Sequence, residues 1–189
     1  MRPGSQNIFR RFLTSTRGVA AIEFAMILPA LATMFLASFD GGRAIAIYMK
    51  VRSATYTLAA ITNQYSTIQS ADMTSITGAT TAVMAPYSSA PAVVTITQIT
   101  ISSKGVATVS WSYSLGGTAL AKGSSVTLPT ALVVDSTYLI FAKVSYTFTP
   151  LFGYFSAGNI TFSDNLYVTP RVSNCINYPP QSISGCVTG

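Results

Sequence analysis

The chain has no histidine, and charged residues make up only 8% of its 189 positions. The absence of histidine excludes histidine general bases, Ser-His-Asp triads and histidine metal ligands. Soluble domains carry about a quarter charged residues, so the composition argues against a cytosolic enzyme. The few acids lie far apart, and two carboxylates meet only if the fold brings them together. These acids are Glu23, Asp40, Asp72, Asp135 and Asp164.

Serine and threonine are abundant in place of charge, at 47 residues. A chain that has few charges, many hydroxyl groups and many β-branched residues suits an exported β-rich surface better than a catalytic cleft. The pairs Gly41-Gly42 and Gly116-Gly117 are isolated and match no phosphate-binding loop. We find no nucleophile–base pair and no metal-ligand cluster in the sequence. The sequence therefore predicts a protein that is not an enzyme and that uses no cofactor or metal.

The net charge of +6 is concentrated around one apolar run. From residue 54 onward, four basic residues face three acids, a net of +1 (4 − 3). A nucleic-acid-binding protein would carry its basic residues on the folded domain, so no nucleic-acid partner is expected. Basic residues that flank an apolar run instead indicate membrane topology. Those before the run are Arg2, Arg10, Arg11 and Arg17, and those after it are Arg43, Lys50 and Arg52.

Residues 19–39, VAAIEFAMILPALATMFLASF, predict a transmembrane helix. Seventeen of these 21 residues are apolar, and a helix of this length rises about 31 Å, close to the thickness of the bilayer core. The arginines before it place the N-terminus in the cytoplasm and the chain after residue 40 outside it. A cleaved signal peptide is the alternative, but its apolar core would be shorter.

Two residues inside this run depart from the apolar pattern. Pro29 lacks a backbone N–H and is expected to kink or loosen the helix. Glu23 places a carboxylate in the span, at a cost of several kcal/mol if it is unpaired near the membrane centre. Because Glu23 is only the fifth residue of the run, it is either a boundary acid without a role or one half of a buried ion pair.

The segment RGVAAIEF, from Arg17 to Phe24, resembles the processing site of type IV pilins and pseudopilins. Residues 16–60 resemble the TadE/TadG family of Tad (Flp) pilus assembly proteins, with Leu28-Pro29 in mid-span and Gly42-Arg43 after it. The resemblance implies that a prepilin peptidase cuts between Gly18 and Val19. Uncleaved anchors in the same family share much of this sequence, so the motif leaves both outcomes open.

The resemblance also implies roles for the residues after the cut. Cleavage would leave a charged amine on Val19, and the Glu23 carboxylate of one subunit could pair with the Val19 amine of its neighbour. Glu23 and the adjacent aromatic Phe24 are therefore the candidate assembly residues. The expected function is that of a minor pilin or pseudopilin that helps to assemble or anchor a Tad pilus. Its partners would be other pilin subunits, the peptidase and the lipid bilayer of the bacterial inner membrane.

The alternative function is an uncleaved, membrane-tethered periplasmic module that binds a ligand or partner. In either case the expected organisation is a basic cytoplasmic leader (1–18), a transmembrane helix (19–39, with the TadE-like segment extending to about 60) and an extracytoplasmic α+β domain (40–189).

Asp40-Gly41-Gly42-Arg43 offer flexibility just outside the span, and the transmembrane helix is expected to continue into a second helical stretch. Apolar and small residues then recur every three or four positions and predict an amphipathic helix. They are Ile45, Tyr48, Val51, Thr55, Leu58, Thr62 and Tyr65. A second short helix is expected from about Met73 to Met84, with an N-cap within residues 70–72 and Pro86 after its end.

From residue 91 the pattern changes to period two with β-branched residues, which predicts strands. Residues 92–102 and 106–115 form a predicted hairpin, residues 116–130 a loop, and residues 137–149 and 159–168 two further strands. The expected fold is α+β, in which an antiparallel meander packs against the amphipathic helix. Two sets of residues are each expected to share one sheet face. They are Ala107, Val109, Trp111 and Tyr113, and Ile140, Ala142, Val144, Tyr146 and Phe148.

Cys175 and Cys186 are the only cysteines, and ten residues lie between them. Both fall in the part of the chain expected outside the cytoplasm, where disulfides form. A redox pair would more often be spaced C-x-x-C, and two thiols are too few for a structural zinc site. The spacing therefore favours a structural disulfide. Trp111 and the other aromatic residues are interpreted as core residues and not as a ligand site.

Overall fold

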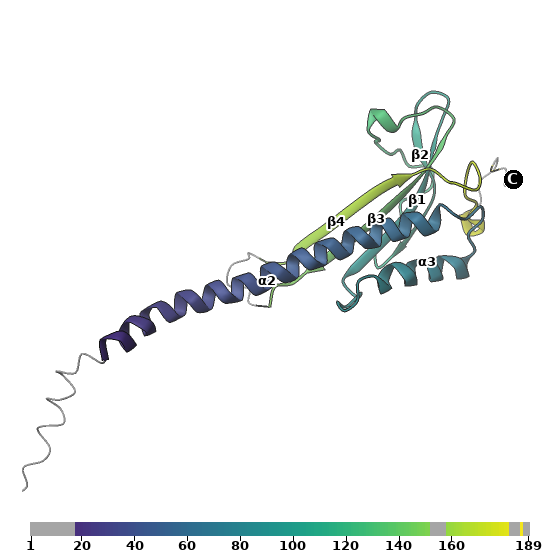
Figure 1. Ribbon diagram of the computed structural model, residues 1–189. Coiled ribbons are helices and arrows are strands. Elements are labelled where there is room, and N and C mark those ends of the chain that lie inside the picture. Colours follow the sequence, from purple (N-terminus) through teal and green to yellow (C-terminus); the bar gives the residue numbers. More distant parts are fainter. Residues whose placement is uncertain (1–17, 152–157, 182–185, 187–189) are drawn as a thin grey trace, which may run out of the picture. The chain divides into compact units, whose positions relative to one another are not determined.

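A computed structural model describes residues 18–151, 158–181 and 186 (Figure 1). Its elements are α2 (Val19–Thr62), α3 (Ser70–Ala82), β1 (Ala92–Ile101), β2 (Ala107–Leu115), η2 (Thr130–Leu132), β3 (Tyr138–Phe148), β4 (Ile160–Val168) and η3 (Pro179–Gln181). The chain divides into two compact units, one ending at Gly42 and the other beginning at Arg43. The predicted α+β class is confirmed by the long apolar helix and the four-stranded antiparallel sheet.

The first unit contains the apolar part of α2, which is long and apolar enough to cross a membrane. Pro29 lies inside the helix and does not end it. The two hydroxyl residues of the span bond to their own helix: Thr33 donates to the carbonyl of Ala30 (2.9 Å) and Ser38 to that of Met34 (2.8 Å). Their polar groups are therefore satisfied without water, as a membrane helix requires.

The helix continues through residues 40–43, which confirms the predicted continuation of the span into an amphipathic helix. A glycine costs a helix about 1 kcal/mol relative to alanine. Gly41 and Gly42 are followed at once by good helix formers, and helix propagation is cooperative, so two glycines are not enough to end it.

The part of α2 in the second unit buries one face, as the spacing predicts. Val51, Thr55, Leu58 and Thr62 are buried as expected, but Ile45 and Tyr48 are 59% and 45% exposed. The buried face is rotated from the predicted one and also includes Ile47, Ala54 and Ala59. The Thr55 hydroxyl donates to the Val51 carbonyl (3.0 Å), and the Thr62 hydroxyl donates to the Leu58 carbonyl (2.7 Å). These hydrogen bonds allow both hydroxyls to be buried.

Helix α3 begins three residues earlier than predicted, because its N-cap is Gln69. The N-cap predicted within residues 70–72 is therefore wrong; Asp72 is the third helical residue, and its carboxylate accepts a hydrogen bond from the Gln69 backbone N–H at 2.9 Å. This reciprocal arrangement is a capping box. Pro86 follows the end of the helix as expected.

The strand order is β2-β1-β3-β4, with every pair antiparallel. The β1–β2 hairpin is confirmed, but the predicted meander is wrong because β3 pairs with β1 and not with β2. The loop after β2 explains this order. It returns along the outer edge of β2, where Val109 donates to the Ser124 carbonyl (2.9 Å) and Val126 to the Ala107 carbonyl (3.0 Å). With that edge covered, β3 pairs with the other side of β1.

A bulge in the β1–β2 pair overturns the predicted face of β2. Gln98 pairs with Trp111 and the next residue, Ile99, pairs with Val109, so Ser110 is an extra residue. One extra residue moves the following side chains to the opposite face. Trp111 therefore lies in the core that packs against the helices, whereas Ala107 lies in a second cluster.

Most of the core lies between the sheet and residues of α2 and α3. The predicted β3 face is confirmed, since all five of its residues belong to this core: Ile140, Ala142, Val144, Tyr146 and Phe148. The second, smaller cluster joins Ile99, Ile101, Ala107 and Leu139 to Leu128 of the long loop.

Candidate functional site

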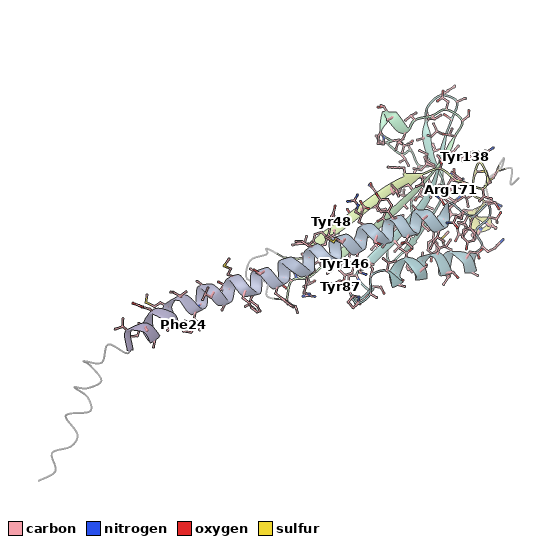
Figure 2. All side chains as sticks on the ribbon, viewed as in Figure 1. Phe24, Tyr48, Tyr87, Tyr138, Tyr146 and Arg171 are labelled. Atoms are coloured by element: carbon pink, nitrogen blue, oxygen red, sulfur yellow. A yellow bond between two sulfur atoms is a disulfide. The ribbon has the colours of Figure 1, made fainter. Side chains whose placement is uncertain are left out.

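The predicted processing and assembly residues lie at the start of α2. The helix begins at Val19, directly after Gly18. Glu23 follows Val19 by four positions, so the two residues are neighbours on one helix face. Both are exposed, as is Phe24, at 60% (Figure 2). Gly18 thus lies directly before α2 and the other three predicted residues lie in its first two turns, while the leader arginines lie outside the described residues.

The first unit presents an apolar helix with nothing covering it. No residue from Gly18 to Gly42 is buried, and Met26 and Phe35 are 77% and 71% exposed. Exposed apolar surface on this scale marks a membrane or protein contact. The acids lie near its two ends, at Glu23 and Asp40. The arrangement suits insertion in lipid with an acid close to the N-terminal end.

The second unit has a C-terminal segment that packs beside the end of α2. Arg171 donates its backbone N–H to the Asn63 carbonyl (3.0 Å). Asn177 donates to the Ser66 carbonyl and its own carbonyl accepts from Ile68, each at 2.9 Å. These backbone bonds attach residues 171–177 to the turn that leaves α2.

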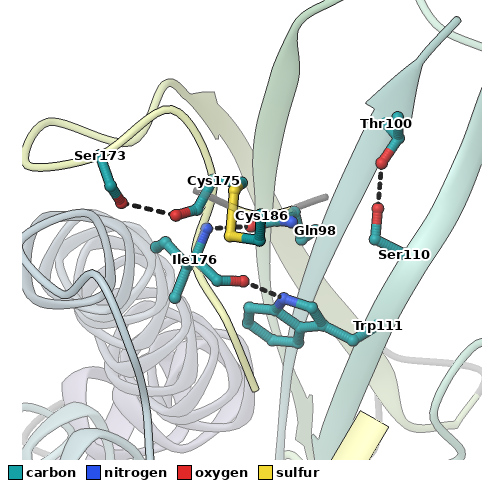
Figure 3. The surroundings of a disulfide bond; sticks show 8 residues. All are labelled: Gln98, Thr100, Ser110, Trp111, Ser173, Cys175, Ile176 and Cys186. Carbon is teal, nitrogen blue, oxygen red and sulfur yellow. Dashed lines mark hydrogen bonds between the residues drawn. A yellow bond between two sulfur atoms is a disulfide. The ribbon is translucent and has the colours of Figure 1, made fainter. Parts of the chain in front are cut away.

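Ile176 is held from both sides by buried polar side chains (Figure 3). Its N–H donates to Gln98 Oε1 (2.6 Å), and its carbonyl accepts from Trp111 Nε1 (2.8 Å). Gln98, Trp111 and Ile176 are all fully buried. The core assignment of Trp111 is confirmed. The sequence analysis missed Gln98, although a glutamine at a core-facing strand position signals a buried partner.

The disulfide between Cys175 and Cys186 is present, as predicted, with 5.7 Å between the Cα atoms. Cys175 is buried and directly precedes Ile176. Two residues further on, the ring of Tyr178 packs on Trp111 at 5.3 Å between centroids. Burial raises the pKa of the Tyr178 hydroxyl, and Tyr113 adds a smaller effect in the same direction. The C-terminal segment is therefore part of the domain core.

Removing this disulfide is expected to destabilise the second unit. In the double variant Cys175→Ala/Cys186→Ala, the free energy of unfolding should fall by about 2.5–3 kcal/mol, because the unfolded chain regains the entropy of an open loop. Chemical denaturation of the full chain in detergent measures the difference. Mass spectrometry without reductant provides the control, and two free thiols in freshly prepared exported protein would contradict the assignment.

The part of the chain that the structure describes contains no cluster of three or more metal-binding side chains. Helix α2 is the segment that matches a known protein family. Residues 18–60 match the family model of TadE-like proteins.

This match confirms the predicted resemblance over the same segment. The TadE-like segment covers α2 almost to its last residue, and it includes Gly18, Val19, Glu23 and Phe24. Neither a curated protein nor a solved structure matches the chain.

Proposed function

We propose that this protein is a minor pilin-like or pseudopilin-like structural subunit that takes part in assembling or anchoring a Tad (Flp) pilus. The TadE-like match supports a part in Tad pilus assembly. One observation carries the finer proposal. The matched segment is a single helix that starts with the Gly18–Phe24 motif, continues as an exposed apolar span and ends with a face buried in the second unit.

The proposed chemistry uses the first turns of α2. A prepilin peptidase cuts after Gly18, and the new amine of Val19 carries a positive charge. In the assembled pilus, Glu23 of one subunit pairs with this amine on the next. Two opposite charges in a low dielectric attract strongly, and each alone carries a large desolvation penalty. The pair therefore sets the register of neighbouring subunits, and Phe24 packs beside it.

Further along α2, an exposed stripe offers a second contact with pilin subunits. Ile45, Met49 and Tyr56 are 59%, 63% and 49% exposed and recur at helical spacing. Arg52 lies between them, 5.9 Å from the Tyr56 ring centroid. The Tyr56 hydroxyl raises the pKa of Arg52 above its usual value. This stripe, together with the apolar span, gives α2 a long surface for packing against other helices.

In this proposal, residues 1–18 form the cytoplasmic leader, residues 19–39 the inner-membrane span and residues 40–189 the periplasmic domain. The disulfide supports this topology because such bonds form and persist outside the cytoplasm. Incorporation of the protein into the pilus itself is compatible with the same arrangement.

Cleavage after Gly18 gives the direct test of the proposal. We expect the wild-type protein extracted from membranes to begin at Val19, and the variant Gly18→Leu to remain full length because the larger side chain obstructs the peptidase. N-terminal sequencing and gel mobility measure both. Gly41→Leu is a matched control: Gly41 lies within α2, away from the cut, a Cβ there meets nothing within 4 Å, and the variant should still be cut.

A wild-type protein that starts before Val19 would contradict processing and favour the uncleaved, membrane-tethered binding module. A start beyond residue 39 would instead reveal a removed signal peptide. Fractionation of sheared pili and membranes then distinguishes a filament subunit from a membrane-resident one.

A further inference from the structure

A cavity of about 360 Å³ opens at one end of the sheet, where β3 begins and β4 ends. Pairing of Ile140 with Val168 brings these two strand ends side by side. One wall comes from the turn before β3 and the other from the segment after β4. The residues that matter for its chemistry are Ser136, Tyr138, Thr169, Pro170 and Asn174.

The lining is polar but uncharged. It has hydroxyl groups and one amide, and no acidic or basic side chain belongs to it. Two of its hydroxyls are occupied, since Thr137 donates to the Val134 carbonyl and Ser173 to that of Cys175. No hydrogen bond within the described residues engages the side chains of Ser136, Tyr138, Thr169 or Asn174. Four groups that can donate and accept hydrogen bonds are thus available to a ligand, three of them on the exposed residues Ser136, Thr169 and Asn174.

Both walls are held in place before any ligand arrives. On the β3 side, Ser136 has a left-handed backbone (φ 59°), and the Thr137 hydroxyl bonds to Val134 at 2.6 Å. On the β4 side, Cys175 is fixed by the disulfide and by its buried neighbour Ile176. A pre-formed site loses less conformational freedom on binding, so a ligand that fits this cavity would bind at a lower entropic cost.

We propose that this cavity binds a neutral sugar unit of an extracytoplasmic glycan. Its volume is at the small end of ligand pockets, which suits one or two sugar rings. Neutral donors and acceptors match sugar hydroxyls, while Tyr138 and Pro170 supply apolar surface for the C–H face of a ring. A charged ligand would lose its hydration without gaining a counter-charge from the lining. The inference rests on the cavity and on the proposed extracytoplasmic placement of this domain, and it does not depend on cleavage after Gly18.

Binding is tested with the full chain in a polyoxyethylene detergent, which carries no sugar headgroup. The probes are N,N′-diacetylchitobiose, cellobiose and the anionic 3′-sialyllactose. Their binding is measured by calorimetry and saturation-transfer NMR. We expect the neutral disaccharides to bind. Asn174→Ala and Tyr138→Phe should each weaken binding about three- to tenfold, the effect of one lost hydrogen bond. Ser163→Ala, an exposed hydroxyl on β4 outside the cavity, should change nothing.

The two neutral probes distinguish the source of the sugar. Preference for diacetylchitobiose indicates an N-acetylated glycan such as that of a cell wall, and preference for cellobiose indicates a plain hexose polymer. Three results would overturn the proposal: no binding of either neutral probe at millimolar concentration, preference for 3′-sialyllactose, or binding that Asn174→Ala and Tyr138→Phe leave unchanged. None of these results bears on processing, which N-terminal sequencing tests separately.

Discussion

Replacing Glu23 with glutamine is expected to prevent association between subunits while leaving membrane insertion and cleavage after Gly18 intact. Glutamine keeps the size and hydrogen bonding of the side chain but leaves the neighbouring Val19 amine unpaired in a low dielectric. Removing one partner of a buried pair costs about 3–5 kcal/mol, which corresponds to a loss of association of more than about 100-fold. Insertion becomes easier, because a charge has left the span.

The measurement is the yield of crosslinked subunits at constant membrane level, together with the number of pili. Glu23→Asp keeps the charge and should retain part of the association. Asp135→Asn makes the same change of charge at an exposed loop residue outside α2 and should behave as wild type. If Glu23→Gln assembles and supports piliation as well as the parent, Glu23 is only a boundary acid and the ion-pair mechanism is wrong.

Trp111→Ala is expected to have the largest effect on the stability of the second unit. The side chain is fully buried, packs on Tyr178 and donates to the Ile176 carbonyl. Truncating a buried tryptophan costs about 3–5 kcal/mol through the cavity it leaves. An unpaired buried carbonyl adds about 1–3 kcal/mol. The sum is a large part of the 5–15 kcal/mol that stabilises a typical domain, so the variant should be largely unfolded or degraded.

Two variants separate the contributions. Trp111→Phe keeps most of the apolar volume and removes the donor to Ile176, so it should lose less stability than Trp111→Ala. Tyr56→Ala truncates an exposed aromatic residue whose ring contacts Arg52, and it should change the free energy of unfolding by no more than about 1 kcal/mol. Because Trp111 is the only tryptophan, unfolding is followed by near-ultraviolet circular dichroism of the tyrosines. Wild-type stability of Trp111→Ala would show that the C-terminal segment does not depend on this contact.

The sequence by itself determined the features that depend on local sequence patterns. The apolar run at residues 19–39 lies in the exposed part of α2, and the period-two segments became β1 to β4 with boundaries within one residue of those predicted. The cysteine pair needed only composition and spacing, whereas the Gly18–Phe24 motif was recognised by its resemblance to a known processing site. Hydrophobic periodicity acts over a few residues, so it can be read without knowing what lies opposite.

Features that depend on contacts between residues distant in sequence were decided only by the tertiary structure. The extra residue Ser110 becomes a bulge only against β1, and that bulge moves Trp111 into the main core and Ala107 out of it. The edge of β2 is covered by its own loop, so β3 lies beside β1. The burial of Gln98 is explained by its hydrogen bond with Ile176, which lies 78 positions away in the C-terminal segment. The cavity forms only because the start of β3 lies beside the end of β4. Such pairings are selected by the packing of the whole domain. The alternation of residues along a strand predicts which of its faces is apolar, but it does not predict which strand lies beside it.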